Sequence, residues 1–166
     1  MTAMTDAVRL LLVRELEAFA REIEMFPTDD AVWRTVPGIT NSAGNLALHV
    51  CGNLKHFVGA VLGNSGYIRD RDAEFSRTDG NRSLILREIR ETIDVVSRVL
   101  PELSEATLEG AYPQRVAGVE VPCGRWLMHL CAHLAFHLGQ AGYLRRMVTR
   151  ENRNSGAVPV PVLAQQ

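Results

Sequence analysis

Hydrophobic residues recur every three or four positions along several stretches of the chain, which is the spacing of one face of an α-helix. The first such stretch runs from about residue 5 to residue 25. Its apolar positions are Val8, Leu12, Leu16, Phe19, Ile23 and Phe26. Pro27 and the polar residues that follow end the pattern. We therefore expect a first long amphipathic helix.

Two further helices are predicted in the middle of the chain. Asn41 or Ser42 is the N-cap of the earlier one, and Gly63 begins its exit. The later one begins at about residue 83 and ends at Pro101. Their apolar faces are Leu46, Val50, Phe57, Val61 and Leu62 in the first case, and Ile85, Ile89, Ile93, Val96 and Leu100 in the second.

The last predicted helix, residues 124–150, is apolar on most of its circumference and should therefore pack on several neighbours. Four long helices without a strong strand pattern indicate an all-α four-helix bundle. We expect one domain over residues 1–150 and an irregular C-terminal tail over residues 151–166, which are rich in helix breakers.

Two connections stand out. Residues 63–82 are densely charged and show no periodicity, and a connection of this length inside a domain is often a lid or a binding loop. Residues 112–122 alternate weakly between polar and apolar, with Ala117-Gly118 where a tight turn would sit. That pattern allows a short β-hairpin before the last helix but does not require one.

Charge excludes one class of partner. The 166 residues include 18 basic and 19 acidic ones, for a net charge of −1, and no basic run is present. We therefore expect no nucleic-acid partner. No stretch has the roughly 18 uninterrupted apolar residues that a membrane span requires, so no membrane partner is expected either.

The N-terminal residues and the cysteines predict the cellular compartment of the protein. Arg9, Arg14 and Glu15 interrupt the first leucines, which argues against an export signal. The three cysteines form no C-x-x-C pair, and an odd count fits reduced thiols. A cytoplasmic protein is the expectation.

Histidines carry the candidate chemistry. His129, His133 and His137 stand four residues apart on the last helix, so each neighbouring pair can present ring nitrogens to one ion. The outer two lie about 12 Å apart along the axis, too far to share an ion easily. Either neighbouring pair is therefore a candidate ligand set. His49 and His56, seven residues apart, share a face of the second helix.

An H-x-x-x-H pair joined by one histidine of a facing helix would make a three-histidine metal site with open positions. The simpler interpretation is five unrelated histidines, each satisfied by one hydrogen bond. No Glu-x-x-His or His-Glu-x-x-His motif is present, which argues against di-iron bundles and the usual zinc peptidases. Cys51 and Cys131 point away from the histidines and are read as small core residues.

Two segments resemble the DinB-like (DinB/YfiT) family of metal-binding four-helix bundles. "HLAFHLGQAGYLRRM" carries the H-x-x-x-H-x-G-Q pattern of the last helix, and "NLALHVCGNLKHF" supplies a histidine on the second. "RDRDAEF" is similar to a sequence that follows the first ligand in a subgroup. The resemblance implies an up-down-down-up bundle, a homodimer, and a divalent ion, zinc or nickel, bound by His49, His133 and His137.

The resemblance leaves several nearby residues without a role. His56 and His129 either form a second polar layer, bonded to each other or to an anion, or are simply solvated. Asn45 and Asn53 are candidates to orient a ligand imidazole, although Asn45 is equally suited to cap the start of its helix, and Gln140 is a candidate near His137. The charged loop, which holds Arg69, Asp70, Arg71, Asp72 and Glu74, is expected to be mainly salt-bridged, with an arginine on a substrate carboxylate as the alternative.

Relatives in the family include thiol S-transferases and an isomerase that use bacillithiol, mycothiol or glutathione. Three neutral imidazoles leave an ion its full positive charge, which favours ionisation of a bound thiol. The motif also contains no carboxylate base for hydrolysis. We therefore expect a metal-dependent transferase that joins a small thiol to an electrophile. The alternative is a non-catalytic metal-binding or stress-response protein.

Overall fold

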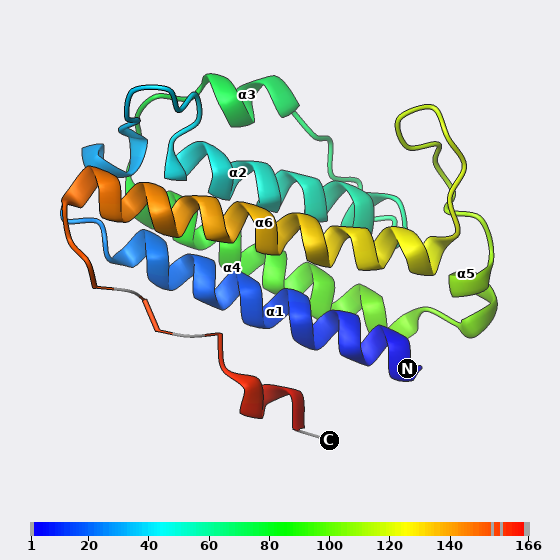
Figure 1. Cartoon of the computed structure of the whole chain (residues 1–166). Helices are drawn as coiled ribbons and strands as arrows, with labels where there is room; N and C mark the ends of the chain where they lie inside the picture. The colour runs from blue at the N-terminus through cyan, green and yellow to red at the C-terminus, as the bar shows by residue number, and fades with distance from the viewer. Residues whose placement is uncertain (1, 154, 157, 165–166) are drawn as a thin grey trace.

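Four long helices lie along a common axis in the computed structural model, which describes residues 2–153, 155–156 and 158–164. They are α1 (Ala3–Glu24), α2 (Ala43–Leu54), α4 (Arg82–Val99) and α6 (Cys123–Thr149). Helices α1 and α6 run in one direction and α2 and α4 in the other (Figure 1). Since α1 and α2 each pack mainly against α4 and α6, they are diagonal partners. The predicted all-α, up-down-down-up bundle is confirmed.

Side-chain caps fix where three of these helices begin, including α4, where Asn81 accepts from the Ser83 amide at 2.7 Å. The Thr2 hydroxyl accepts a hydrogen bond from the Thr5 amide at 3.1 Å at the start of α1. Ser42, and not Asn41, caps α2: its hydroxyl accepts from the Asn45 amide at 3.1 Å, and the Asn45 side chain accepts from the Ser42 amide at 3.0 Å. This reciprocal capping box fixes the register of α2, on which His49 lies.

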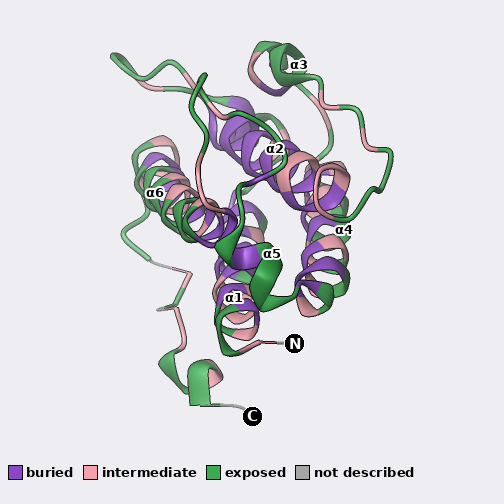
Figure 2. Ribbon diagram, turned by 90° about the vertical axis from the view of Figure 1, so that its right-hand side faces the viewer, coloured by how far each residue is buried: buried purple, intermediate pink, exposed green. Residues whose placement is uncertain are grey.

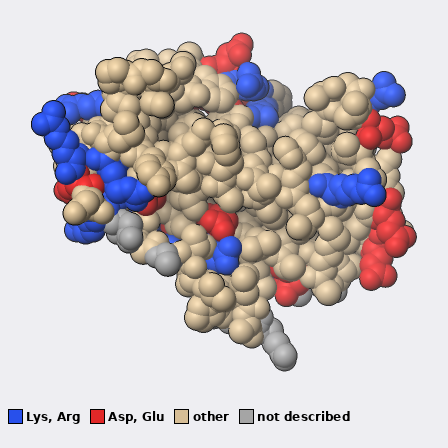
Figure 3. Space-filling view, viewed as in Figure 1, with Lys and Arg blue, Asp and Glu red and all other residues tan. Residues whose placement is uncertain are grey.

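The predicted apolar stripes face the interior of the bundle (Figure 2). Leu12 and Phe19 of α1 and Ile89 of α4 have no exposed surface. The outer side of α6 is different, because Phe136 and Tyr143 remain 61% and 70% exposed. The middle of this side also carries few charged residues (Figure 3). Helix α6 is therefore less fully covered than its apolar sequence predicts.

Helix α2 does not end at Leu54 but widens into a π-helical turn, η2 (Lys55–Ala60). Its amides bond to carbonyls five residues earlier, as in the bond from Val61 to His56 at 3.0 Å. The wide turn begins one residue before His56. The same-face spacing of an ideal α-helix therefore does not carry over from His49 to His56.

The connections contain short helices that periodicity did not predict. They are α3 (Arg71–Ser76), α5 (Glu105–Glu109), and the 3₁₀ turns η1 (Asp30–Trp33), η3 (Leu100–Glu102) and η4 (Val160–Ala164). Segments of three to six residues are too short to show an apolar period. The charged connection 63–82 thus includes α3, and η4 lies in the C-terminal tail.

The connection before α6 has the shape of a hairpin without regular strands. Two isolated β-bridges join Ala111 to Pro122 and Val116 to Val119. Ala117 and Gly118 form the turn with φ angles of 50° and 80°, close to where the sequence placed it. Among the described residues there is no strand, and no helix is long and apolar enough to cross a membrane.

Candidate metal centre

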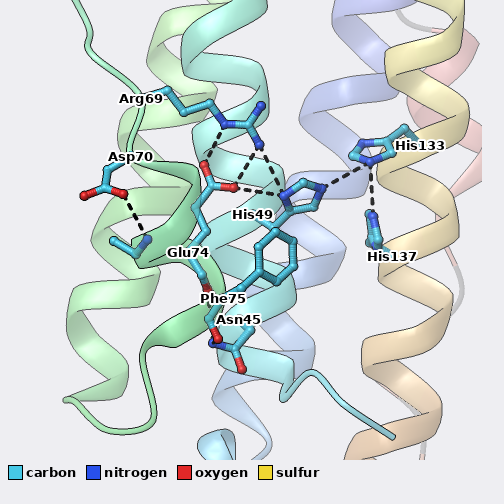
Figure 4. A network of polar contacts seen from close by, with 9 residues as sticks. Asn45, His49, Arg69, Asp70, Glu74, Phe75, His133 and His137 are labelled. Atoms are coloured by element: carbon cyan, nitrogen blue, oxygen red, sulfur yellow. Dashed lines mark hydrogen bonds and ion pairs between the residues drawn. The ribbon is translucent and has the colours of Figure 1, made fainter. Parts of the chain in front are cut away.

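Three histidines from two neighbouring helices meet between α2 and α6. His49 projects from α2, while His133 and His137 project from successive turns of α6 (Figure 4). The Nε2 atom of His133 lies 3.3 Å from that of His49 and 3.1 Å from that of His137. The three ligand atoms all lie within 4.8 Å of one another. The structure therefore brings together the set that the family resemblance selected.

Hydrogen-bond acceptors behind two of the rings fix which nitrogen faces inward. His49 donates from Nδ1 to the Glu74 carboxylate at 2.9 Å, and His137 donates from Nδ1 to the Gln140 carbonyl oxygen at 2.8 Å. A neutral imidazole with its proton on Nδ1 has a lone pair on Nε2. The Nε2 lone pairs of both rings are thereby left free toward the centre, as metal ligands require.

Glu74 is itself held in place from two sides. Arg69 donates to both carboxylate oxygens, from Nε at 2.7 Å and from Nη2 at 2.8 Å. Burial favours the neutral acid, but the hydrogen bonds from His49 and Arg69 outweigh it and lower the pKa of Glu74. A Cβ atom on Gly52 would stand 2.0 Å from a Glu74 oxygen, so glycine is needed there for this close approach.

Helix α3 carries Glu74 and is tied to α2 by Asn45. The Asn45 amide donates to the carbonyl oxygens of Glu74 at 3.0 Å and Arg77 at 2.8 Å. Asp70 caps α3 by accepting from the Ala73 amide at 3.0 Å. Asn45 thus caps α2, which was one of its two predicted roles, and also supports the centre through the backbone of α3.

The α6 histidines of the centre are neutral at neutral pH. Burial lowers the pKa of His133 to about 4, and the charges of His137 and His49 add to the effect. Burial also lowers the pKa of His137, against an opposing hydrogen bond to Gln140. Neutral imidazole is the form that binds a metal ion, so at these two rings protons do not compete with an ion at pH 7.

His56 and His129 lie outside this centre and do not form a shared layer in the described structure. His56 is within 3.1 Å of the Gln114 side chain in the connection before α6. The His129 ring is exposed and stacks on Trp126 at a centroid distance of 4.8 Å. Trp126 contacts Phe57, and Phe57 contacts the His56 ring. Two aromatic rings, Trp126 and Phe57, therefore lie between His129 and His56.

The other residues that the sequence suggested for the site are Asn53, Arg69 and Arg71. Asn53 is buried on α2, and within the described residues no hydrogen bond connects it to the three histidines. Arg71 is exposed, with its guanidinium 5.0 Å from the centre of the Phe75 ring. Arg69 is salt-bridged, as expected for this loop. Glu74 was predicted only as part of that salt-bridged loop, and its bond to His49 was missed.

Comparisons with known proteins agree with this arrangement. The family model described as the DinB superfamily matches residues 11–141. Among solved structures, a conserved protein from Enterococcus faecalis has a similar fold, with a TM-score of 0.74 and 16% identity. The match covers 91% of this chain and 99% of that one, and at this identity it shows the fold alone. A comparison with curated proteins gave no match.

Proposed function

The chain belongs to the DinB superfamily, and on that basis we propose that it is a metal-dependent transferase that activates a low-molecular-weight thiol. In this proposal a divalent ion, zinc or nickel, is bound by His49, His133 and His137. The single observation that carries it is the convergence of three ligand nitrogens within 4.8 Å. The proposal includes a cytoplasmic homodimer whose catalytic domain is residues 1–150.

The residues fit a tetrahedral ion by distance and by charge. Nitrogen ligands at about 2.0–2.1 Å from zinc stand roughly 3.3–3.4 Å apart in a tetrahedron. Two of the three Nε2 separations, 3.1 and 3.3 Å, are close to this spacing, and all three ligand atoms lie within 4.8 Å of one another. Three neutral donors also supply no negative charge, which leaves the ion strongly electrophilic.

Such an ion, when bound, lowers the pKa of a thiol and favours the thiolate at neutral pH. The chain supplies its ligands, their orientation and access. His133 and His137 are only half-buried, which is expected of a site that admits substrate. In the transfer, sulfur bonds to the electrophilic carbon, the leaving group departs with its bonding electrons, and the thiol proton passes to water.

The position of Glu74 favours thiol transfer over hydrolysis. This carboxylate is near the centre but lies on the far side of His49 from the other two rings (Figure 4). Both of its oxygens already accept hydrogen bonds. Because a general base must reach the proton that it removes, Glu74 is poorly placed to activate a water molecule.

The attacking thiol is proposed to come from a small molecule and not from the protein. Cys51 and Cys123 are buried, and Cys131 is partly buried. Burial raises the pKa of Cys51 to about 12 and that of Cys131 to about 11. Thiols with such values are protonated at neutral pH and react slowly.

Elemental analysis combined with a thiol-conjugation screen tests the proposal. Purified wild-type protein, His133→Ala and the matched control His129→Ala are compared for bound metal, then assayed with bacillithiol, mycothiol and glutathione against a panel of electrophiles. We expect metal and conjugation in the wild type and the control, and neither in His133→Ala. Normal metal content in His133→Ala would refute the ligand set. Bound metal without any conjugation would favour the alternative, a non-catalytic metal-binding or stress-response protein.

A further inference from the structure

A cavity of about 440 Å³ lies between the C-terminal half of α6 and the start of α2 with the connection before it, and none of the three histidines lines it. Its wall on α6 includes Gln140, three residues after His137, and its wall on α2 includes Leu46, three residues before His49. Three residues of helix span about 4.5 Å. The cavity therefore begins within one helical turn of the centre, on the side toward the C-terminus of α6.

The residues that line this cavity are mainly apolar. The side that carries no polar side-chain amide or aliphatic hydroxyl consists of Ile39, Leu46, Gly139, Tyr143, Leu144 and Met147. Three of them are unusually open to solvent, since Ile39 is 46% exposed, Tyr143 70% and Met147 56%. In the part of the chain that the structure describes, no charged side chain lines the cavity. A volume of this size suits a small organic molecule.

The lining also has polar groups, but few of them. Thr40, Asn41 and Gln140 are its polar side chains, Gly38 completes the wall, and the oxygen of Gln140 accepts a hydrogen bond from His137 at 2.8 Å. The Arg146 guanidinium lies over the Tyr143 ring, 4.8 Å from its centre, and lines an adjoining hollow, not this cavity. The wall thus offers no cation to pair with a carboxylate or a phosphate.

From this placement we propose that the cavity binds the uncharged aryl or alkyl group of the electrophilic substrate. The inference rests on the proposed function, because it takes the neighbouring histidines to be the centre where the thiol reacts. The substrate group that enters the cavity is therefore apolar and uncharged. A carboxylate or phosphate on the same group would lose its hydration without gaining a charged partner.

Gly139 provides a way to fill the cavity without disturbing the fold. It lines the cavity on α6, and a Cβ atom added there meets no atom within 4 Å. Gly139→Leu should therefore occupy the space that the substrate group needs, whereas Gly139→Ala should leave most of it open. The alanine variant is the matched control, because both changes remove the same glycine from α6.

Methyl NMR of labelled methionine gives a readout that does not depend on turnover. Met147 lines the cavity, while Met128, 49% exposed, lies farther along α6 and outside it. Naphthalenemethanol, an uncharged aromatic probe, is titrated into wild type, Gly139→Ala and Gly139→Leu, each with and without zinc. Naphthoic acid serves as the charged analogue. Zinc affinity is measured for every variant.

We expect a saturable shift of the Met147 signal with naphthalenemethanol and little shift of Met128. Gly139→Leu should weaken binding at least about tenfold, a loss of roughly 1.4 kcal/mol or more, with unchanged zinc affinity. Equal binding of naphthoic acid, equal shifts of both methionines, or full binding to Gly139→Leu would overturn the inference.

Two further results separate this inference from the proposed function. If a second copy of the chain covers the cavity, the Met147 signal will depend on protein concentration and the probe will not bind, which overturns the inference while zinc binding persists. If the probe binds but the wild type binds no metal, the cavity is retained as an apolar site and the proposed function fails.

Discussion

The five histidines fall into two groups that differ in what lies behind each ring. In the inner group, His49 and His137 donate from Nδ1 to Glu74 and Gln140, and their Nε2 atoms face His133. In the outer group, His129 stacks on an aromatic ring and His56 bonds to Gln114. Both groups come from the same two helical segments at similar spacings. Spacing therefore gives the candidates, and the contacts of the Nε2 atoms distinguish them: those of the inner group face one another, whereas that of His56 is bonded to Gln114.

The strongest test of this difference compares the two histidines of the second helical segment. His49→Ala should lower zinc affinity by more than the roughly 10–100-fold expected for the loss of an outer partner, because it removes a ligand. His56→Ala should leave the affinity unchanged. Competition with a chromophoric chelator measures both. Similar losses in the two variants would mean that the inner and outer groups do not differ as described.

Removal of Glu74 should have the next largest effect. Glu74→Ala takes away the acceptor of the His49 proton and should reduce zinc affinity about 10–100-fold. Glu74→Gln should lose less, because an amide oxygen still accepts from Nδ1. Glu88→Gln is the control, since Glu88 bonds to Lys55 at 2.8 Å and not to a histidine. An affinity in Glu74→Ala equal to that of the control would contradict the role of Glu74.

A smaller effect is expected from Gly52→Ala. The added methyl group would overlap the Glu74 carboxylate and push it away from α2 without changing any ligand. Zinc affinity should fall, but less than in Glu74→Ala, because the displaced acid can still rotate toward His49. Gly139→Ala, whose Cβ enters open space, is the matched control for the same competition assay. Wild-type affinity in Gly52→Ala would show that the close approach is unimportant.

The long helices were predictable from a local cause, whereas the choice among the histidines was not. An apolar residue every three or four positions predicts the four long helices. The four-residue steps on α6 left His129/His133 and His133/His137 as equal candidate pairs, and the family resemblance selected the second. His49 required the family resemblance, since spacing alone left His49 and His56 equivalent. The π-turn that separates them begins at Lys55 and has no clear signature in the sequence.

Glu74 shows why the rest of the site was not predictable. It lies 25 residues after His49, on a six-residue helix within a charged connection. Its contact depends on the path of that connection and on the Asn45 side chain, which binds the end of α3. Neither follows from helical periodicity. The same holds for Gln114, which reaches His56 from a connection 58 positions away in the sequence.

Almost no effect is expected when both outer histidines are removed. In the double variant His56→Ala/His129→Ala, metal content and thiol conjugation should match those of the wild type. Neither ring places a nitrogen among the three ligand atoms, and the His129 ring reaches the cluster only by stacking on His133 at a centroid distance of 6.0 Å. Elemental analysis and the conjugation assay measure the two quantities. Loss of metal in this variant would show that the outer histidines belong to the centre after all.

The cysteines should be the least responsive groups, although they lie on the same two helices as the histidines. Burial raises the pKa of Cys51 to about 12, so native protein at pH 8 should take up almost no iodoacetamide at this residue. Mass spectrometry should find all three cysteines alkylated in denaturant. Rapid alkylation of native Cys51 would contradict the assignment of the thiol to a small molecule.

The central claim is that three histidines of one chain hold a divalent ion that remains open to a thiol. X-ray absorption spectroscopy of the zinc-loaded protein, with and without a small thiol, tests it directly. The account predicts three imidazole nitrogens at about 2.0–2.1 Å and one oxygen, with the oxygen replaced by sulfur at about 2.3 Å when thiol is added. Fewer than three imidazoles, sulfur before thiol is added, or a shell that thiol does not change would contradict it.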